Sequence, residues 1–279
     1  KPYLRGTPLP EHLAPLYRRF NPSEEQLANG ANPWTDVMVD DDPSAFVTAT
    51  GTDVAGRKQR LYSPEHHARA SGDKFERVRA LLTEWEDLRT QIESDLNDRS
   101  TTDKIKEAAL VAYLIYETGI RPGSRSDTRA KVQAFGATTL QLRHVKPSPR
   151  GVRLKFTGKK GVRQNVLVTN PYLVRVMLKR KRDNPQWSSD LFTVSTSTLN
   201  WYMHTLGSGS YSAKDLRTGR GTSLALELLS NRKRFPKSRS RKRAIVNDCL
   251  DRVARMLGNS RSVSRKSYVD PEVLEKWIN

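Results

Sequence analysis

The chain has 279 residues, and its 49 Lys and Arg residues outnumber its 30 Asp and Glu residues to give a net charge of +19. A chain of this length divides into two domains, and so large a positive charge favours a polyanion as the partner. No run of 18 apolar residues is present, which excludes a membrane-spanning helix, and the single cysteine, Cys249, excludes an internal disulfide.

The first 70 residues differ in charge from the rest of the chain. They hold eight Lys and Arg against nine Asp and Glu, so the remaining 41 basic and 21 acidic residues give the rest a net charge of +20. Two β-prone runs, residues 46–50 and 59–62, flank a turn-forming segment at 51–56. We therefore predict a small, mostly β N-terminal domain at residues 1–70.

A helical pattern begins at Ser71 and marks the start of a second domain, residues 71–279. One apolar stripe runs along it, formed by Phe75, Val78, Leu81, Leu82, Trp85, Leu88, Ile92 and Leu96. A second helix is expected from Thr102 through Tyr116, with Gly119 at its C-terminal cap. Arg121 follows this helix end, where it can either pair with the helix dipole or meet a ligand.

Three β-prone segments come next, at residues 138–145, 152–157 and 162–168. In the middle segment apolar and polar residues alternate, which gives the strand one apolar and one basic face. We predict a three-stranded antiparallel sheet with Lys159 at the tip of its last hairpin. Taken alone, a lysine at such a turn is most often a solvated side chain.

The remainder is expected to be helical. Helices are predicted at residues 171–181, 195–206, 213–229 and 244–257, and a last one opens at Asp270-Pro271. Lys214 and Arg217 lie one helical turn apart on a common face. Eight of the twelve residues 232–243 are basic, which is typical of a disordered linker or of a segment that contacts phosphates. The expected class is α+β, with a mainly helical larger domain.

Two groups of residues invite a metal-site interpretation, and both are better explained otherwise. The acidic triplet Asp40-Asp41-Asp42 precedes Pro43 and is typical of a solvated loop. The five histidines, including His66 and His67, show no metal-ligand spacing with Cys249. Cys249 itself falls in an apolar helical pattern and is expected to be buried. No metal site is predicted.

Tyr268 is either a buried anchor or a nucleophile, and the residues before it favour the second. An Arg after a helix, a Lys at a hairpin tip, a Lys-x-x-Arg, a Gly-Asn-Ser and a Tyr follow in that order. The chain resembles the type IB DNA topoisomerases, in particular the compact poxviral and bacterial enzymes, from Ala49 to the final helix. The most specific parts are Gly136-Ala137-Thr138-Thr139-Leu140, Phe156-Thr157-Gly158-Lys159, Lys214-Asp215-Leu216-Arg217-Thr218 and Ser264-Arg265-Lys266-Ser267-Tyr268.

The resemblance implies a role for each of these residues. Tyr268 would be the nucleophile, Arg121 and Arg217 would bind the scissile phosphate, and Lys159 would be the general acid. Asn259 stands where the family usually has a His, and its amide can donate to a phosphate oxygen in the same way. The implied product is a DNA 3′-phosphotyrosine with a free 5′-hydroxyl, formed without ATP, metal or other cofactor.

The resemblance also implies the partner, which is double-stranded DNA enclosed by the two domains of a monomer. The candidate DNA contacts are Arg57, Lys58, Gln59, Tyr62, Lys214, Arg265 and Lys266. No carboxylate or His belongs to the constellation, so we expect Tyr268 to be activated by the nearby cations rather than by a base. Such an enzyme would act in the cytoplasm or nucleoid of a bacterium, or as a viral or phage protein in a host cell.

Two alternatives remain open, and the chain departs from the family pattern at three places. They are Asn259, the segment Pro122-Gly123-Ser124-Arg125-Ser126 after Arg121, and the unusually basic residues 232–243. A tyrosine recombinase uses an Arg, a Lys, a His-x-x-Arg and a Tyr, but here Lys214 replaces the first His. A relative that binds DNA without cutting it is the other alternative.

Overall fold

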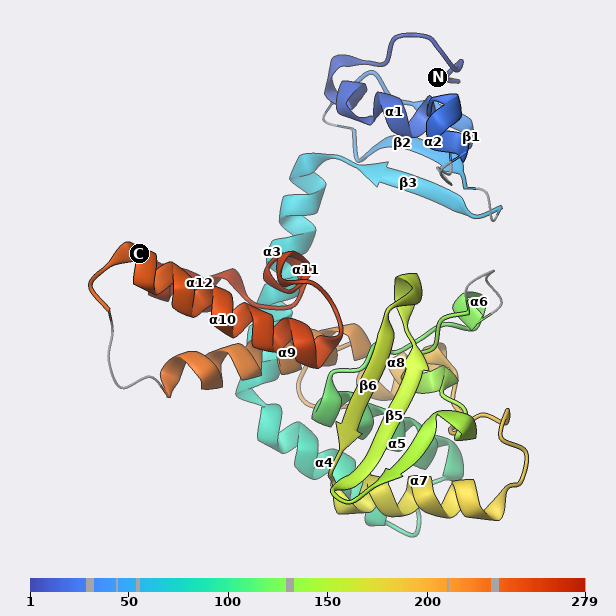
Figure 1. The fold of residues 1–279 in the computed structure, drawn as a ribbon, viewed down its shortest axis with the longest axis vertical. Helices are drawn as coiled ribbons and strands as arrows, with labels where there is room; N and C mark the ends of the chain where they lie inside the picture. Colours follow the sequence, from blue (N-terminus) through green and yellow to red (C-terminus); the bar gives the residue numbers. More distant parts are fainter. Residues whose placement is uncertain are drawn as a thin grey trace. The chain divides into compact units, whose positions relative to one another are not determined.

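The computed structural model describes residues 1–28, 33–43, 45–53, 56–128, 133–209, 211–231 and 236–278. The chain divides into two compact units, Lys1–Lys74 and Phe75–Asn279 (Figure 1). Helix α3, Pro64–Thr83, contains the point of division, so this helix begins before the predicted Ser71. The start signal that the periodicity missed is Ser63-Pro64, because Ser63 Oγ accepts a hydrogen bond from the His66 amide at 3.2 Å.

The first unit combines a sheet with short helical segments. Its strands are β1 (Thr35–Val39), β2 (Val47–Thr52) and β3 (Lys58–Tyr62), which pair antiparallel in the order β1-β2-β3. Three helical segments precede them, η1 (Glu11–Leu16), α1 (Tyr17–Phe20) and α2 (Glu24–Ala28). The β-prone runs predicted β2 and β3, whereas β1 and the helices were missed. Part of the predicted turn, residues 54 and 55, lies outside the described residues.

The predicted apolar stripe after Ser71 belongs to two helices rather than one. α3 ends at Thr83 and α4 spans Trp85–Asn97, with Glu84 between them at φ −101° and ψ 12°. The Glu84 carboxylate accepts hydrogen bonds from the Ser208 amide at 3.0 Å and the Tyr211 hydroxyl at 3.2 Å. The stripe residues Phe75, Val78, Leu81, Leu88, Ile92 and Leu96 are buried as expected.

Helix α5, Asp103–Thr118, is the central element of the second unit. Residues 108–116 are buried all round, and the helix packs against α4, α8 and α9. It ends at Gly119, whose φ of +66° is the left-handed conformation predicted for a C-terminal cap. Arg121 therefore follows directly after the end of a helix that neighbouring helices hold in place.

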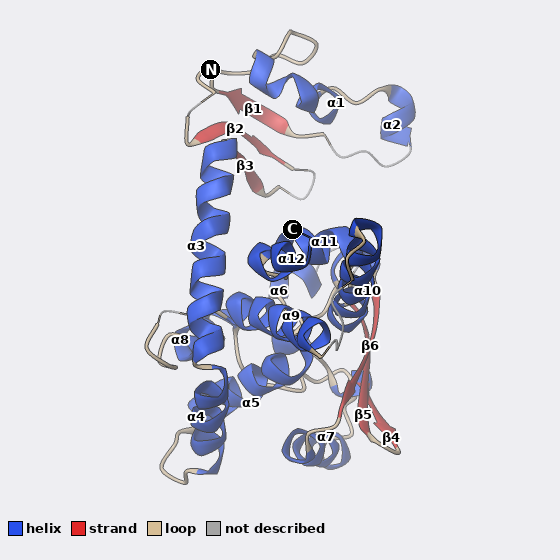
Figure 2. Ribbon diagram, turned by 90° about the vertical axis from the view of Figure 1, so that its left-hand side faces the viewer, coloured by secondary structure: helices blue, strands red, loops and turns tan. Residues whose placement is uncertain are grey.

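The second sheet is shorter at its start than predicted. Its strands are β4 (Val145–Ser148), β5 (Gly151–Thr157) and β6 (Arg163–Val168), paired antiparallel in that order. Residues 138–144, expected to be a strand, instead form two 3₁₀ turns, Ala137–Thr139 and Leu142–His144. Val152, Leu154 and Phe156 of β5 are buried, as their alternation predicted, and helix α7 packs against β4 and β5 (Figure 2).

The remaining helices follow the predicted order with three differences. They are α6 (Arg125–Thr128), α7 (Pro171–Asp183), α8 (Thr196–Met203), α9 (Ala213–Ser230), α10 (Arg239–Leu257), α11 (Arg261–Ser267) and α12 (Pro271–Ile278). α6 and α11 were not predicted. α10 begins at Arg239, so the last part of the basic run is helical rather than a linker, while residues 232–235 lie outside the described residues.

Two hydrophobic clusters form the core of the second unit, and α9 belongs to both. Ala213 and Leu216 pack in the larger cluster around α5, whereas Ala225 and Leu229 pack in a second cluster with α10 and α12. Cys249 is buried in the second cluster, as expected. None of the described helices is both long enough and apolar enough to cross a membrane.

Candidate active site

Arg217 lies on α9 between the two clusters and is only 2% exposed. Its Nη1 donates to the Gly119 carbonyl at the end of α5, and its Nη2 donates to the Leu257 carbonyl at the end of α10, at 2.8 Å. The dipoles of both helices place partial negative charge at these carbonyls. One guanidinium therefore joins the C-terminal ends of two helices.

Burial lowers the pKa of Arg217 to about 10, Tyr268 partly offsets this effect, and Arg121 adds to it. A pKa of this size still leaves the guanidinium charged at neutral pH. Its Nε is buried without a hydrogen-bond acceptor among the described residues. Arg217 thus brings a permanent positive charge and an unused donor into the protein interior.

Tyr268 lies directly against both arginines. The Arg121 Nη1 donates to the Tyr268 phenol oxygen at 2.8 Å, and Cζ of Arg217 lies 4.5 Å from the centroid of the ring. Tyr268 is 5% exposed and follows the last residue of α11. The two arginines and the tyrosine that the sequence analysis singled out are therefore in direct contact.

The backbone of Tyr268 is held by α9 and α11. Its N–H donates to the Ser264 carbonyl at 3.0 Å, and its own carbonyl accepts from the Thr222 hydroxyl at 3.4 Å. Gly221 makes this approach possible, because a Cβ there would stand 2.5 Å from the Tyr268 carbonyl oxygen. The ring is thereby fixed beside Arg217, which α9 also carries.

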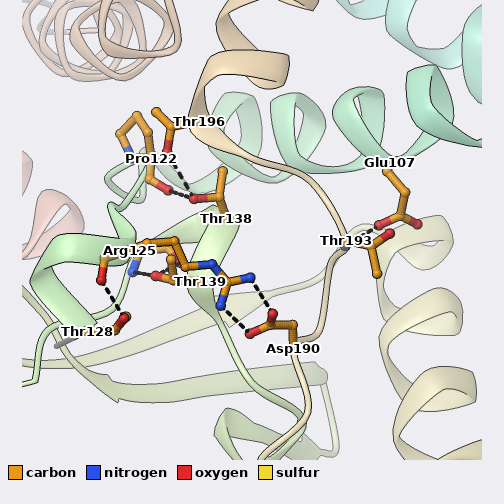
Figure 3. A network of polar contacts seen from close by, with 10 residues as sticks. Glu107, Pro122, Arg125, Thr128, Thr138, Thr139, Asp190, Thr193 and Thr196 are labelled. Carbon is orange, nitrogen blue, oxygen red and sulfur yellow. Dashed lines mark hydrogen bonds and ion pairs between the residues drawn. The ribbon is translucent and has the colours of Figure 1, made fainter.

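The loop that bears Arg121 is hydrogen-bonded to residues 136–139. The Ala137 and Thr138 amides donate to the carbonyls of Arg121 and Pro122, each at 2.8 Å. The Thr138 hydroxyl also donates to the Pro122 carbonyl at 3.0 Å, and the Arg125 side chain forms an ion pair with Asp190 (Figure 3). These contacts fix the loop where its sequence departs from the family pattern.

Gly136 is required for this close contact between the two segments. A Cβ at this position would lie 2.5 Å from both the Cα and the amide nitrogen of Gly123 and 2.6 Å from the Arg121 carbonyl oxygen. Real Cβ atoms do not approach backbone so closely, so only glycine fits. The residues Gly136-Ala137-Thr138-Thr139 form a turn rather than a strand because the amides of Ala137 and Thr138 bond to the Arg121 loop.

Lys159 lies at the turn between β5 and β6, as predicted, and is exposed. Its ammonium forms no hydrogen bond or ion pair with the described residues. It lines a small pocket with residues of both hydrophobic clusters, namely Ile120, Arg121, Phe135, Phe156, Gly158, Gln164, Arg217, Leu257 and Gly258. The exposed ammonium group of Lys159 and the guanidinium groups of Arg121 and Arg217 therefore line one pocket.

Gln164 joins this hairpin to the end of α10. Its side-chain amide donates to the Gly258 carbonyl at 3.4 Å, and Gly258 adopts φ +61°. A Cβ on Gly258 would lie 2.0 Å from the Gln164 Oε1, so the contact depends on glycine here too. The sequence analysis missed Gln164, and no sequence pattern indicated it.

Asn259 follows Gly258 directly and presents its amide nitrogen without a partner. The Asn259 Oδ1 accepts a hydrogen bond from the Ser264 hydroxyl at 2.5 Å, while Nδ2 is buried with no acceptor among the described residues. Asn259 is therefore an ordered N–H donor on the segment that leads into α11.

The predicted DNA contacts in the second unit are exposed. Lys214, Arg265 and Lys266 all reach solvent. Lys214 and Arg217 lie one turn apart on α9 but differ in burial, because Lys214 is exposed whereas Arg217 is buried. One helical turn of α9 therefore turns one cation outward and the other into the core.

The predicted contacts in the first unit are mostly paired within the unit. Arg57 Nε and Gln59 Nε2 both donate to the Asp53 carboxylate, at 2.9 and 2.8 Å, and Lys58 bonds to Thr52. The Tyr62 ring lies against His66, with ring centroids 4.8 Å apart. The His67 side chain lies outside the described residues. No group of His, Cys, Asp and Glu in the described part of the chain could hold a metal ion.

A protein family and a viral protein both match most of this chain. Residues 63–279 match the family described as eukaryotic DNA topoisomerase I, catalytic core. A DNA topoisomerase 1B of Acanthamoeba polyphaga mimivirus is 29% identical over 259 residues, which cover 88% of this chain and 76% of the viral protein.

Two crystal structures of the XerH site-specific recombinase bound to difH DNA, one before and one after cleavage, also match. They are 19% and 18% identical, with TM-scores of 0.40 and 0.41, and each match covers 68% of this chain. The chain spans about half of each recombinase chain, 51% and 50%.

Proposed function

The chain belongs to the family of the eukaryotic DNA topoisomerase I catalytic core, and we propose that it is a type IB topoisomerase that cuts one strand of duplex DNA through Tyr268. The observation that carries this proposal is the contact of the Tyr268 phenol with two arginines, Arg121 at 2.8 Å and Arg217 against the ring. The full set of residues that we assign to the reaction is Tyr268, Arg121, Arg217, Lys159 and Asn259.

Cleavage begins when the Tyr268 oxygen attacks the phosphorus of a phosphodiester. A bond forms between this oxygen and phosphorus, the bond to the 5′-oxygen breaks, and the phenol proton is lost to solvent. The Arg121 Nη1 donates a hydrogen bond to this phenol oxygen at 2.8 Å and so holds it beside a positive charge. The DNA is then joined to the protein through its 3′-phosphate.

The transition state carries extra negative charge on the nonbridging phosphate oxygens. Arg121 and Arg217 neutralise it with planar, permanently charged donors, and the unpartnered Asn259 Nδ2 adds a neutral one. The leaving 5′-oxygen is a poor leaving group unless protonated, and the exposed Lys159 ammonium supplies the proton.

Resealing is the reverse of cleavage, because one phosphate ester has replaced another and the bond energy is kept. The 5′-hydroxyl attacks the phosphotyrosine, and no ATP is needed. Between the two steps the free end rotates and supercoils are released. The enzyme is therefore an isomerase of DNA topology.

We also propose how the chain meets DNA. The exposed Lys214, Arg265 and Lys266 bind backbone phosphates near the scissile bond. A monomer acts on the duplex with both of its domains, residues 1–70 and 71–279, and the N-terminal contacts are Arg57, Lys58, Gln59 and Tyr62. The finer fold, a mostly β N-terminal domain on a catalytic domain of the topoisomerase and recombinase type, belongs to the same proposal. The enzyme acts in the cytoplasm or nucleoid of a bacterium, or as a viral or phage protein on DNA in a host cell.

The test is covalent trapping on a DNA strand that loses its 5′-fragment after cleavage. The wild type is expected to form an adduct that maps to Tyr268 and to relax supercoiled plasmid with EDTA present and ATP absent. Tyr268→Phe should abolish both activities, whereas Tyr17→Phe, which changes an exposed tyrosine on α1, should abolish neither. An adduct that survives Tyr268→Phe would contradict the assignment, and recombined products without relaxation would favour a recombinase.

A further inference from the structure

Ser264 occupies the middle of α11, the short helix that lies between Asn259 and Tyr268 in the chain. Its side chain is 0% exposed, and its hydroxyl donates to the Asn259 Oδ1 at 2.5 Å. Its carbonyl accepts from the amides of Tyr268 and Val269, each at 3.0 Å. A single serine therefore contacts both Asn259 and the backbone of Tyr268.

The contact decides which end of the Asn259 amide is available. An amide has an oxygen that accepts and a nitrogen that donates, and only the nitrogen can meet a phosphate oxygen favourably. The Ser264 hydroxyl makes no other hydrogen bond with the described residues, so its hydrogen is directed to Oδ1. The Asn259 Nδ2 is then turned the other way, where it is buried without an acceptor.

A histidine at position 259 would have no carbonyl oxygen to turn towards the phosphate. An asparagine in that place can present the wrong end, and a buried hydroxyl that binds its oxygen prevents this. Building on the proposed function, we propose that Ser264 is a positioning residue that orients the Asn259 amide towards the scissile phosphate. Its carbonyl ties the same helix turn to Tyr268.

The hydroxyl is not needed to start or fold the helix. α11 is capped by Ser260, whose Oγ accepts from the Val263 amide at 3.3 Å. Alanine favours helix more than serine does. Ser264→Ala is thus expected to leave α11 formed, and its effect can be separated from a general loss of structure.

The experiment is a double-mutant cycle with Asn259→Ala and Ser264→Ala, measured as the single-turnover rate of cleavage at saturating protein. Ser264→Ala alone is expected to slow cleavage about tenfold, less than Asn259→Ala, which removes one transition-state donor and costs up to about 10²-fold. In the Asn259→Ala background, Ser264→Ala should have no further effect. DNA affinity should change less than about twofold in all variants.

The control is Ser262→Ala on the same helix, an exposed serine, which should cleave at the wild-type rate. Equal slowing by Ser264→Ala in both backgrounds would show that the serine acts through the structure as a whole and would overturn the proposal. A wild-type protein that forms no covalent adduct through Tyr268 would instead refute the proposed function itself. This outcome depends on the wild-type protein alone and not on the variants.

Discussion

Arg217 and Lys159 line the same pocket, yet Arg217 is 2% exposed and bonded to two helix ends, whereas Lys159 is exposed at a hairpin turn. The ammonium of Lys159 has no partner among the described residues. This difference separates two requirements. A group that stabilises charge works best when it is fixed in advance, whereas a group that delivers a proton must reach the leaving atom. Under the proposed function, the buried cation would support both fold and chemistry, and the exposed one would support chemistry alone.

Lys159→Ala tests the exposed side, and we expect the largest effect on rate there. Cleavage should slow by about 10²–10⁴-fold because general acid help is lost, while the free energy of unfolding changes by less than about 0.5 kcal/mol. Single-turnover cleavage and urea unfolding measure the two quantities. A substrate with sulfur in place of the leaving 5′-oxygen should cancel most of the loss, because a thiolate leaves without a proton.

Lys160→Ala is the matched control for this variant. Lys160 is the next residue of the same turn and is also exposed. Its backbone has φ +62°, and lysine and alanine are both residues with a Cβ, so the substitution does not change the backbone requirement. It should cleave at nearly the wild-type rate. Equal losses in both variants, or no gain with the sulfur substrate, would show that the hairpin contributes only positive charge.

Arg217→Ala tests the buried side and should lower both rate and stability. Loss of a fixed donor to the transition state costs about 10²–10³-fold in cleavage. The carbonyls of Gly119 and Leu257 also lose their partner, which should reduce the free energy of unfolding by about 2–4 kcal/mol. A variant that cleaves slowly but unfolds like the wild type would contradict the dual role.

Gly136→Ala should impair cleavage without touching any reacting group. The added Cβ meets Gly123 and the Arg121 carbonyl at 2.5–2.6 Å, so the loop that carries Arg121 must move. A misplacement of this kind costs up to about 10²-fold in rate. Gly72→Ala on α3, where a Cβ meets nothing within 4 Å, is the control and should cleave normally. Normal cleavage by Gly136→Ala would show that the loop position is not critical.

The elements that the sequence predicted well are those with a strong local signal. Asn170 caps α7 and accepts from the amides of Tyr172 and Leu173, and Gly119 ends α5, because capping depends on a few neighbouring residues. The alternation in β5 also has one clear meaning, since one face of that strand is buried. Capping residues and the alternation of apolar residues were therefore sufficient to predict these helix ends and this strand of the second unit.

The residues that the sequence predicted poorly are those fixed by distant partners. Residues 137–144 have β-prone side chains, but the amides of Ala137 and Thr138 bond to the Arg121 loop, and those of Leu142 and Arg143 bond to the carbonyls of Ser189 and Trp187. These contacts hold the segment in two 3₁₀ turns. α11 lacks an apolar stripe, so its only signal was the Ser260 cap. The burial of Arg217 depends on the ends of α5 and α10, which no local pattern near Arg217 reveals.

His144 packs against residues of the pocket that Lys159 lines. Its protonation gives the smallest expected effect, a change in the free energy of unfolding with pH. Its ring lies 4.5 Å from Phe135 and 6.0 Å from Phe156, centroid to centroid, and both phenylalanines line the pocket of Lys159. The Nδ1 accepts from the Gln141 amide at 3.0 Å. Burial lowers the pKa of His144 from 6.5 to about 4, with smaller effects of the same sign from Arg143 and Lys146.

The sign of the pH dependence follows from this pKa. Between pH 6.5 and 4 the unfolded chain binds a proton at His144 that the folded chain does not, so stability is lost as the pH falls through this range. From pH 7 to 5 the loss is about 2 kcal/mol. His144→Asn keeps an acceptor near the Gln141 amide and does not titrate, so urea unfolding of this variant should show a smaller loss between these pH values. An equal loss of unfolding free energy in the wild type and in His144→Asn would mean that groups other than His144 take up the protons that destabilise the fold.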